Sequence, residues 1–141
     1  MSAHAHRRLA GTGVIATLAA VLVTTLAAAF VRALGIEFEV PDGGETIPLA
    51  GIAFVTGVSS IVGIVIAAAL LRWSARPRER FVRTAMALTT MSLAPPWLVG
   101  AAASTSAALV GLHLVAATVM IPAVTQSLRA VSTTVAEPSR R

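Results

Sequence analysis

Four long apolar runs constrain what this sequence can fold into more than any other feature. They occupy residues 9–31, 47–71, 81–99 and about 107–128. As an α-helix, the first run would extend about 34 Å, which is enough to cross a hydrocarbon core of about 30 Å. Hydrophobic residues make up 56% of the chain and charged residues 12%, against about 25% charged in soluble domains. The pattern predicts an all-α fold, a four-helix transmembrane bundle.

The first run has an alternative interpretation as a secretory signal peptide. Arg7 and Arg8 would supply the basic segment in front of it, and the alanines at 27–29 would mark a cleavage site. The apolar part of a signal peptide has only about 7–15 residues, however, and this run is longer. We therefore favour a span that is retained in the protein.

Basic residues predict the orientation of the spans. Five arginines fill the turn between the second and third runs: Arg72, Arg76, Arg78, Arg80 and Arg83. Both terminal segments are also basic, whereas the loop at residues 32–46 carries four of the six acidic residues. Arginine-rich loops stay on the cytoplasmic side. We expect a multi-pass protein of the plasma membrane with both termini cytoplasmic and the acidic loop outside. The predicted parts are a cytoplasmic tail at 1–8, a membrane domain at 9–129 and a disordered cytoplasmic tail at 130–141.

The basic turn also indicates what the protein contacts. Each arginine near a membrane surface attracts anionic headgroups by about 1 kcal/mol, so the lipid bilayer is an expected partner. The net charge of +5 would also suit nucleic acid. The arginines lie at the ends of apolar runs, however, which indicates a role in membrane topology. We expect no nucleic-acid partner.

The acidic loop contains a strand-like pattern. Within residues 36–40, apolar side chains alternate with Glu37 and Glu39, a period of two residues. The Pro-Asp-Gly-Gly sequence at 41–44 is a strong turn signal. We expect a short extended segment or hairpin over the outer end of the bundle. A solvated loop is favoured over a cation or partner site, because the spacing of the carboxylates fits no calcium-binding loop.

Two kinds of residue predict how the helices pack and where they end. Small and hydroxylated residues on one helix face usually mark a helix–helix contact in membranes. They are Thr17, Ala20, Thr24 and Ala28 in the first run, and Ser59, Gly63 and Ala67 in the second. Prolines interrupt helical hydrogen bonding. Pro95 and Pro96 should kink or stop the third helix, and Pro122 should bend the fourth.

His113 is the one ionisable residue well inside a run, and such a residue merits a functional hypothesis. A proton relay would need a carboxylate at similar depth, and no run contains Asp or Glu. A haem ligand would need a second axial ligand, for which methionines are the candidates. The hydroxyl residues that could complete a ligand site are Ser59, Ser60, Thr89, Thr90 and Ser92. We favour a structural role, in which one such hydroxyl binds His113 across the bundle.

Catalytic and metal-binding patterns are absent from the sequence. Cysteine is missing altogether, which excludes disulfides, thiolate metal sites and cysteine nucleophiles. No Gly-x-Ser-x-Gly motif occurs, and no acid within the runs partners His113. We expect the protein to be no enzyme, to bind no metal and to need no cofactor.

Several short motifs are distributed over residues 31–129. They are Phe38-Glu39-Val40, Ile47-Pro48-Leu49, Leu71-Arg72, Arg76-Pro77-Arg78 with Phe81, Leu112-His113-Leu114, and Ile121-Pro122. With these motifs the chain resembles a family of uncharacterised small four-span membrane proteins found in actinobacteria. That family has no assigned activity, so the resemblance implies a topology and adds no catalytic residue.

Two functions remain open. The first is a non-enzymatic structural or partner-binding bundle that packs with itself or with another membrane protein through its small-residue faces. The second is a small transporter or ligand-binding membrane protein centred on His113 and the hydroxyls of the second and third runs. We favour the first, because His113 lacks ionisable partners at its depth.

Overall fold

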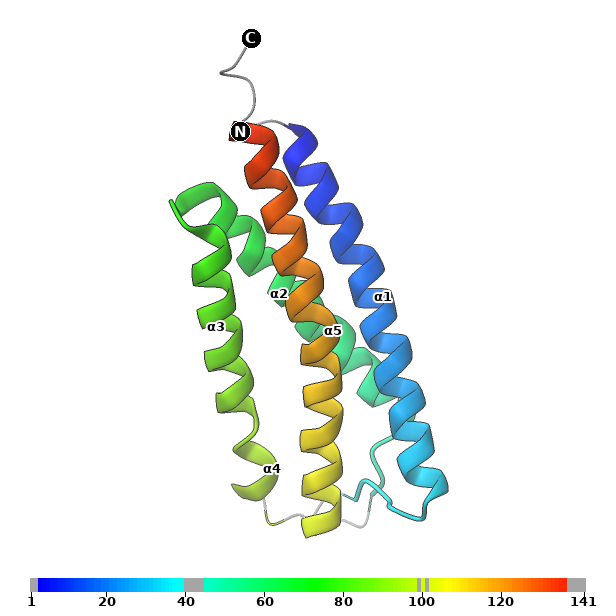
Figure 1. Cartoon of the computed structure of the whole chain (residues 1–141). Coiled ribbons are helices and arrows are strands. Elements are labelled where there is room, and N and C mark those ends of the chain that lie inside the picture. The colour runs from blue at the N-terminus through cyan, green and yellow to red at the C-terminus, as the bar shows by residue number, and fades with distance from the viewer. Residues whose placement is uncertain (1–2, 40–44, 99, 101, 137–141) are drawn as a thin grey trace.

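The computed structural model describes residues 3–39, 45–98, 100 and 102–136, and these are almost entirely helical. The elements are α1 (Ala3–Ala33), α2 (Leu49–Trp73), α3 (Pro77–Ser92), α4 (Pro95–Leu98) and α5 (Ala103–Ala136). Figure 1 shows α1, α2, α3 and α5 side by side along one long axis, with the single turn of α4 at one end. The predicted all-α bundle is confirmed at this level.

Three helices are long and apolar enough to cross a membrane. The spans are Leu9–Ala33 in α1, Leu49–Trp73 in α2 and Ala103–Ala130 in α5. Within their most apolar stretches, only 22%, 11% and 11% of the residues, respectively, are buried inside the protein. Most of their apolar surface therefore faces outward, as it does in proteins whose solvent is lipid.

The third predicted span, residues 81–99, is not one helix of membrane-spanning length. α3 has 16 residues, or about 24 Å, and its first two turns are charged. It ends at Ser92 because Pro95 cannot donate a backbone hydrogen bond and disfavours helical geometry at Ala94. The Ala94 N–H instead bonds the carbonyl of Met91 at 3.3 Å in a tighter turn. The predicted proline stop is confirmed, whereas the single long helix is wrong.

Two helices extend beyond their predicted limits. α1 begins at Ala3, inside the segment predicted as a tail. α5 continues to Ala136, beyond the predicted end of the fourth span at about residue 128. The physical reason is that this stretch lacks proline and glycine, and the first helix-breaking residue is Pro138. Residues 137–141 lie outside the described part of the chain.

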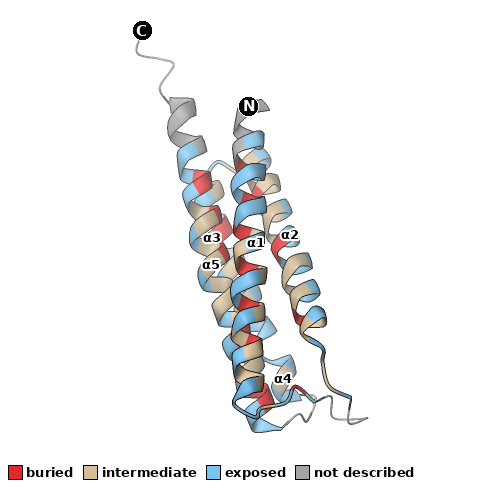
Figure 2. Cartoon of the chain, turned by 90° about the vertical axis from the view of Figure 1, so that its right-hand side faces the viewer, coloured by how far each residue is buried: buried red, intermediate tan, exposed pale blue. Residues whose placement is uncertain are grey.

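α1 packs more extensively against α5 and α2 than any other helix pair does. Its buried positions recur every three or four residues, at Leu9, Gly13, Ala16, Ala20, Thr24 and Ala28. Figure 2 shows short buried segments that recur along α1 between exposed and half-buried ones. Small residues at this spacing allow two backbones to approach closely. The predicted face is confirmed at Ala20, Thr24 and Ala28, and Thr17 is half-buried at its edge.

The predicted contact face of α2 is only partly correct. Ala67 is fully buried, but Ser59 is exposed, and a Cβ atom at Gly63 would have no neighbour within 4 Å. The inward positions are instead Ile52, Ser60 and Ala67. Since α2 is apolar on every side, its sequence pattern does not distinguish the inner face from the outer one.

The loop between α1 and α2 is pinned to the bundle by an aromatic side chain. Phe38 is 0% exposed and packs with Ala28, Ile52 and Leu112. Its carbonyl accepts a hydrogen bond from the Ile47 N–H at 2.7 Å. Next to it, an isolated antiparallel bridge joins residues 39 and 46. The predicted extended segment is confirmed, and its turn at residues 40–44 lies outside the described residues.

The two ends of the bundle differ in what they hold. Figure 1 places the start of α1, the α2–α3 turn and the end of α5 at one end. The α1–α2 loop and α4 lie at the other end. The basic turn and both terminal helix ends thus share one end, and the acidic loop lies at the opposite one.

Replacement of Gly13 tests the close contact between α1 and α2. A Cβ atom there would lie 2.8 Å from Cδ1 and 3.0 Å from Cγ1 of Ile64. We expect Gly13→Leu to lower the free energy of unfolding in detergent by about 1–3 kcal/mol, as overpacking does. The matched control is Gly11→Leu, because nothing lies within 4 Å of that Cβ position. Equal effects of the two substitutions would contradict the packing described.

Candidate functional site

His113 on α5 is hydrogen bonded to Ser92 at the end of α3. Their Nε2 and Oγ atoms are 2.7 Å apart. The two residues are 21 positions apart in sequence, so this contact joins two helices. His113 is half-buried and Ser92 is exposed. The predicted hydroxyl partner of His113 is therefore Ser92.

The surroundings of Ser92 indicate which atom donates the proton. The Ser92 Oγ also lies 2.8 Å from the Leu88 carbonyl and 2.9 Å from the Thr89 carbonyl. A serine hydroxyl has one proton but can accept through its lone pairs. We infer that Ser92 donates to a carbonyl of α3 and accepts the Nε2–H of His113. The histidine thereby completes a hydrogen-bond network at a helix end, where carbonyl groups lack helical partners.

The other predicted site residues are not brought together around His113. Thr90 donates its hydroxyl to the Met86 carbonyl of its own helix at 2.9 Å. Thr89 is half-buried on α3, Ser60 is buried on α2 and Ser59 is exposed on α2. Among the described residues, Ser92 is the one that hydrogen bonds to the His113 ring. The five-hydroxyl constellation thus reduces to one pair.

Two buried hydroxyls in the first turn of α5 were missed by the sequence reasoning. Thr105 donates to the Glu37 carbonyl at 3.0 Å, and Ser106 donates to the Pro96 carbonyl at 2.8 Å. Their residues are 3% and 0% exposed. The sequence feature that could have identified these two hydroxyls is their position just before a long apolar run. With His113, they make the first third of α5 the attachment point for the α1–α2 loop, α4 and α3.

The described residues contain no group of three or more His, Cys, Asp or Glu side chains that could hold a metal ion. The methionines considered as second haem ligands do not share one environment. Met86 and Met91 are 54% and 72% exposed, whereas Met120 is 9% exposed in the core.

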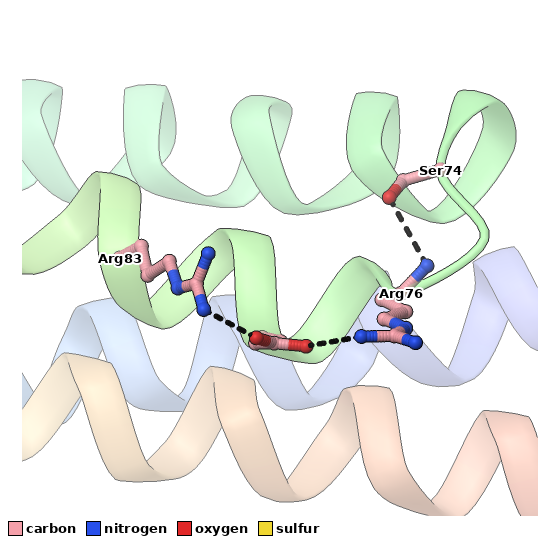
Figure 3. Close-up of polar contacts among 4 residues, drawn as sticks. Ser74, Arg76 and Arg83 are labelled. Carbon is pink, nitrogen blue, oxygen red and sulfur yellow. Dashed lines mark hydrogen bonds and ion pairs between the residues drawn. The ribbon is translucent and has the colours of Figure 1, made fainter.

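The basic turn forms the second candidate site. Figure 3 shows Glu79 between two guanidinium groups, with Arg76 Nη1 at 3.6 Å and Arg83 Nη2 at 2.6 Å. The Ser74 hydroxyl accepts the backbone N–H of Arg76 at 3.2 Å. Both arginine side chains are more than three-quarters exposed, so each ion pair contributes at most about 1 kcal/mol. Trp73, next to this turn, is 77% exposed, and tryptophans at the ends of spans are typical of the membrane interface.

A double-mutant cycle measures the coupling of His113 to Ser92. We expect His113→Ala and Ser92→Ala to couple by about 0.6 kcal/mol in the free energy of unfolding, the average for hydrogen bonds between membrane helices. The matched control cycle replaces Thr90 instead of Ser92 together with His113. Because the Thr90 hydroxyl bonds within α3, the coupling between Thr90 and His113 should be near zero. Chemical unfolding in mixed micelles provides the measurement. Similar coupling in both cycles would contradict a specific Ser92–His113 contact.

Comparison with known proteins places the chain in a family. Neither the curated proteins nor the solved structures contain a match. The sequence pattern of one family matches residues 4–130, which includes all three candidate spans, His113 and the basic turn. That family also has no assigned activity, in agreement with the resemblance drawn from the motifs, while the actinobacterial origin stays a prediction. The chain belongs to the family of unknown function DUF6069.

Proposed function

We propose that this protein is a multi-pass protein of the plasma membrane that acts as a non-enzymatic structural or partner-binding bundle. The observation that carries the proposal is the hydrogen bond from His113 to Ser92. It engages the one ionisable side chain in the apolar interior with a neutral hydroxyl of a neighbouring helix. Such a contact sets the position of one helix against another and requires no ligand.

The proposed orientation has both termini in the cytoplasm. In support, the arginines of the α2–α3 turn lie at the same end of the bundle as the terminal ends of α1 and α5. The exposed acids Glu37, Glu39 and Glu45 lie in the opposite loop. This orientation requires α3 and α4 to cross the membrane together as a broken helix. The hydroxyl bonds of Thr90 and Ser92 to carbonyls of α3 suit that placement, because lipid offers backbone groups no partners.

The outer face of α2 is the proposed surface for a second copy or another membrane protein. Ser59 is exposed there, and a side chain at Gly63 would meet open space. The two residues are one helical turn apart in a span that is otherwise rich in large apolar side chains. A facing helix could approach closely at this point, as it does at other small-residue contacts.

A second candidate function is a small transporter or ligand-binding protein centred on His113. One observation favours it. Ser92 is the last residue of α3, so the Ser92–His113 pair lies beside the break before α4. Broken membrane helices frame the substrate sites of many transporters. We rank this function second, because the atoms of the pair bond one another and the carbonyls of α3.

Cysteine labelling tests the proposed topology without a background signal, since the chain contains no cysteine. Glu45→Cys marks the acidic loop and Ala75→Cys marks the basic turn, and both positions are exposed. In intact cells, we expect a membrane-impermeant maleimide to label position 45 and to reach position 75 only after permeabilisation. The reverse pattern would overturn the orientation. Labelling of both positions in intact cells would overturn the crossing between them.

His113→Ala separates the two candidate functions. If the protein is a structural bundle, the variant lacks this hydrogen bond and its free energy of unfolding falls by about 0.5–1.5 kcal/mol, with no other effect. A ligand-binding protein would gain stability from its ligand, and the variant would lose that gain. We expect small amines, carboxylates and sugars to shift the thermal unfolding midpoint of wild type and variant equally. A compound that stabilises the wild type alone would favour the ligand-binding function.

A further inference from the structure

We propose that the α2–α3 turn holds a discrete binding site for the phosphate of an anionic phospholipid headgroup, formed by Arg76, Arg80 and Arg83. The inference rests on the proposed membrane location. It goes further in assigning a ligand class and particular side chains. A general attraction between a basic surface and a membrane would involve all five arginines of the turn equally.

The three arginines share one hollow at the start of α3. Arg76 is the N-cap residue, and Arg80 follows one turn later, with its N–H bonded to the Arg76 carbonyl at 3.1 Å. Arg83 lies almost one further turn along the same face. Together with Ala75 and Glu79 they line a hollow of about 250 Å³. This is slightly smaller than most pockets for drug-sized molecules, which start at about 300 Å³.

The charges in the hollow favour an anion. Three arginines and one carboxylate line it, and that carboxylate forms ion pairs with Arg76 and Arg83, which Figure 3 draws as dashed lines. Three positive charges against one negative charge leave the hollow positive. Arg80 has no acidic partner among the described residues. Its guanidinium is available for the bidentate hydrogen bonds that arginine forms with phosphate.

The place of the hollow in the fold selects a lipid over a free anion. It lies at the turn between the apolar α2 and the charged first turns of α3, next to Trp73, which is exposed at the end of α2. A tryptophan at the end of a span sits at headgroup level. A wider hollow of about 660 Å³ shares Arg76 and Arg83 with the first, and adds the apolar side chains of Pro77 and Val82 together with Arg78. The arginines at one side suit a phosphate group, and the apolar side chains at the other suit the apolar part of a lipid. Together they match a phospholipid at the edge of the bilayer.

Lipid titration of the purified full chain tests this site. The protein in neutral detergent is titrated with phosphatidylglycerol, phosphatidylcholine or inorganic phosphate, and bound species are counted by native mass spectrometry. We expect phosphatidylglycerol to bind most tightly. Arg80→Gln and Arg83→Gln should each weaken the affinity for phosphatidylglycerol about fivefold, and the double variant about thirtyfold. These factors correspond to a loss of about 1 kcal/mol of binding free energy per arginine. The matched control is Arg32→Gln at the opposite end of α1, which should leave the affinity unchanged.

Three outcomes would overturn the inference. They are equal binding of phosphatidylcholine, equal weakening by Arg32→Gln, and inorganic phosphate that binds as tightly as the lipid. Circular dichroism of each variant verifies that the helices are retained. The proposed membrane location is tested separately, by the cysteine labelling. A protein that inserts in the proposed orientation but does not prefer phosphatidylglycerol contradicts the lipid site alone.

Discussion

The close approach of α1 to α5 and α2 is the contact on which the rest of the structure depends. It is made along a face of small residues, with Ala16, Ala20 and Ala28 nearly or fully buried. Lipid is as apolar as the helices, so burial of apolar surface gives little drive for their association. Dispersion between closely packed backbones and side chains must supply it. Larger side chains such as Ile15, Leu18 and Leu22 are left on the outside of α1.

The remaining segments attach to this three-helix unit by polar contacts at one end and by the buried Phe81 of α3 at the other. The first third of α5 holds the α1–α2 loop through Thr105, α4 through Ser106 and α3 through His113. Each of these bonds satisfies a group that lipid would leave unpaired. At the opposite end, exposed arginines surround Glu79. The hydrogen bonds of α5 thus join parts of the bundle to one another, and its basic end is the part that we propose for recognition.

Much of this architecture could be predicted from the residues, because hydropathy and charge act locally. Three of the spans, the proline stop after α3 and the extended segment before Thr46 follow from such signals. The end of α3 was placed too late, because Pro95 and Pro96 stop a run that is apolar on average. The choice of Ser92 among five hydroxyls was beyond the sequence, since it depends on how far α3 is shifted along α5. The inner face of α2 was placed at Ser59 instead of Ser60, because α2 is apolar on every side.

Oxygen accessibility of spin labels along α1 tests the central claim most directly. Because the chain has no cysteine, single cysteines at successive positions can each carry one label in a reconstituted bilayer. The account predicts a profile that oscillates with the helical period of about 3.6 residues. Its maxima should fall at Ile15, Leu18, Leu22 and Leu26, and its minima at Ala16, Ala20 and Ala28. A flat profile, or maxima on the alanine face, would contradict the packing of α1 between α5 and α2.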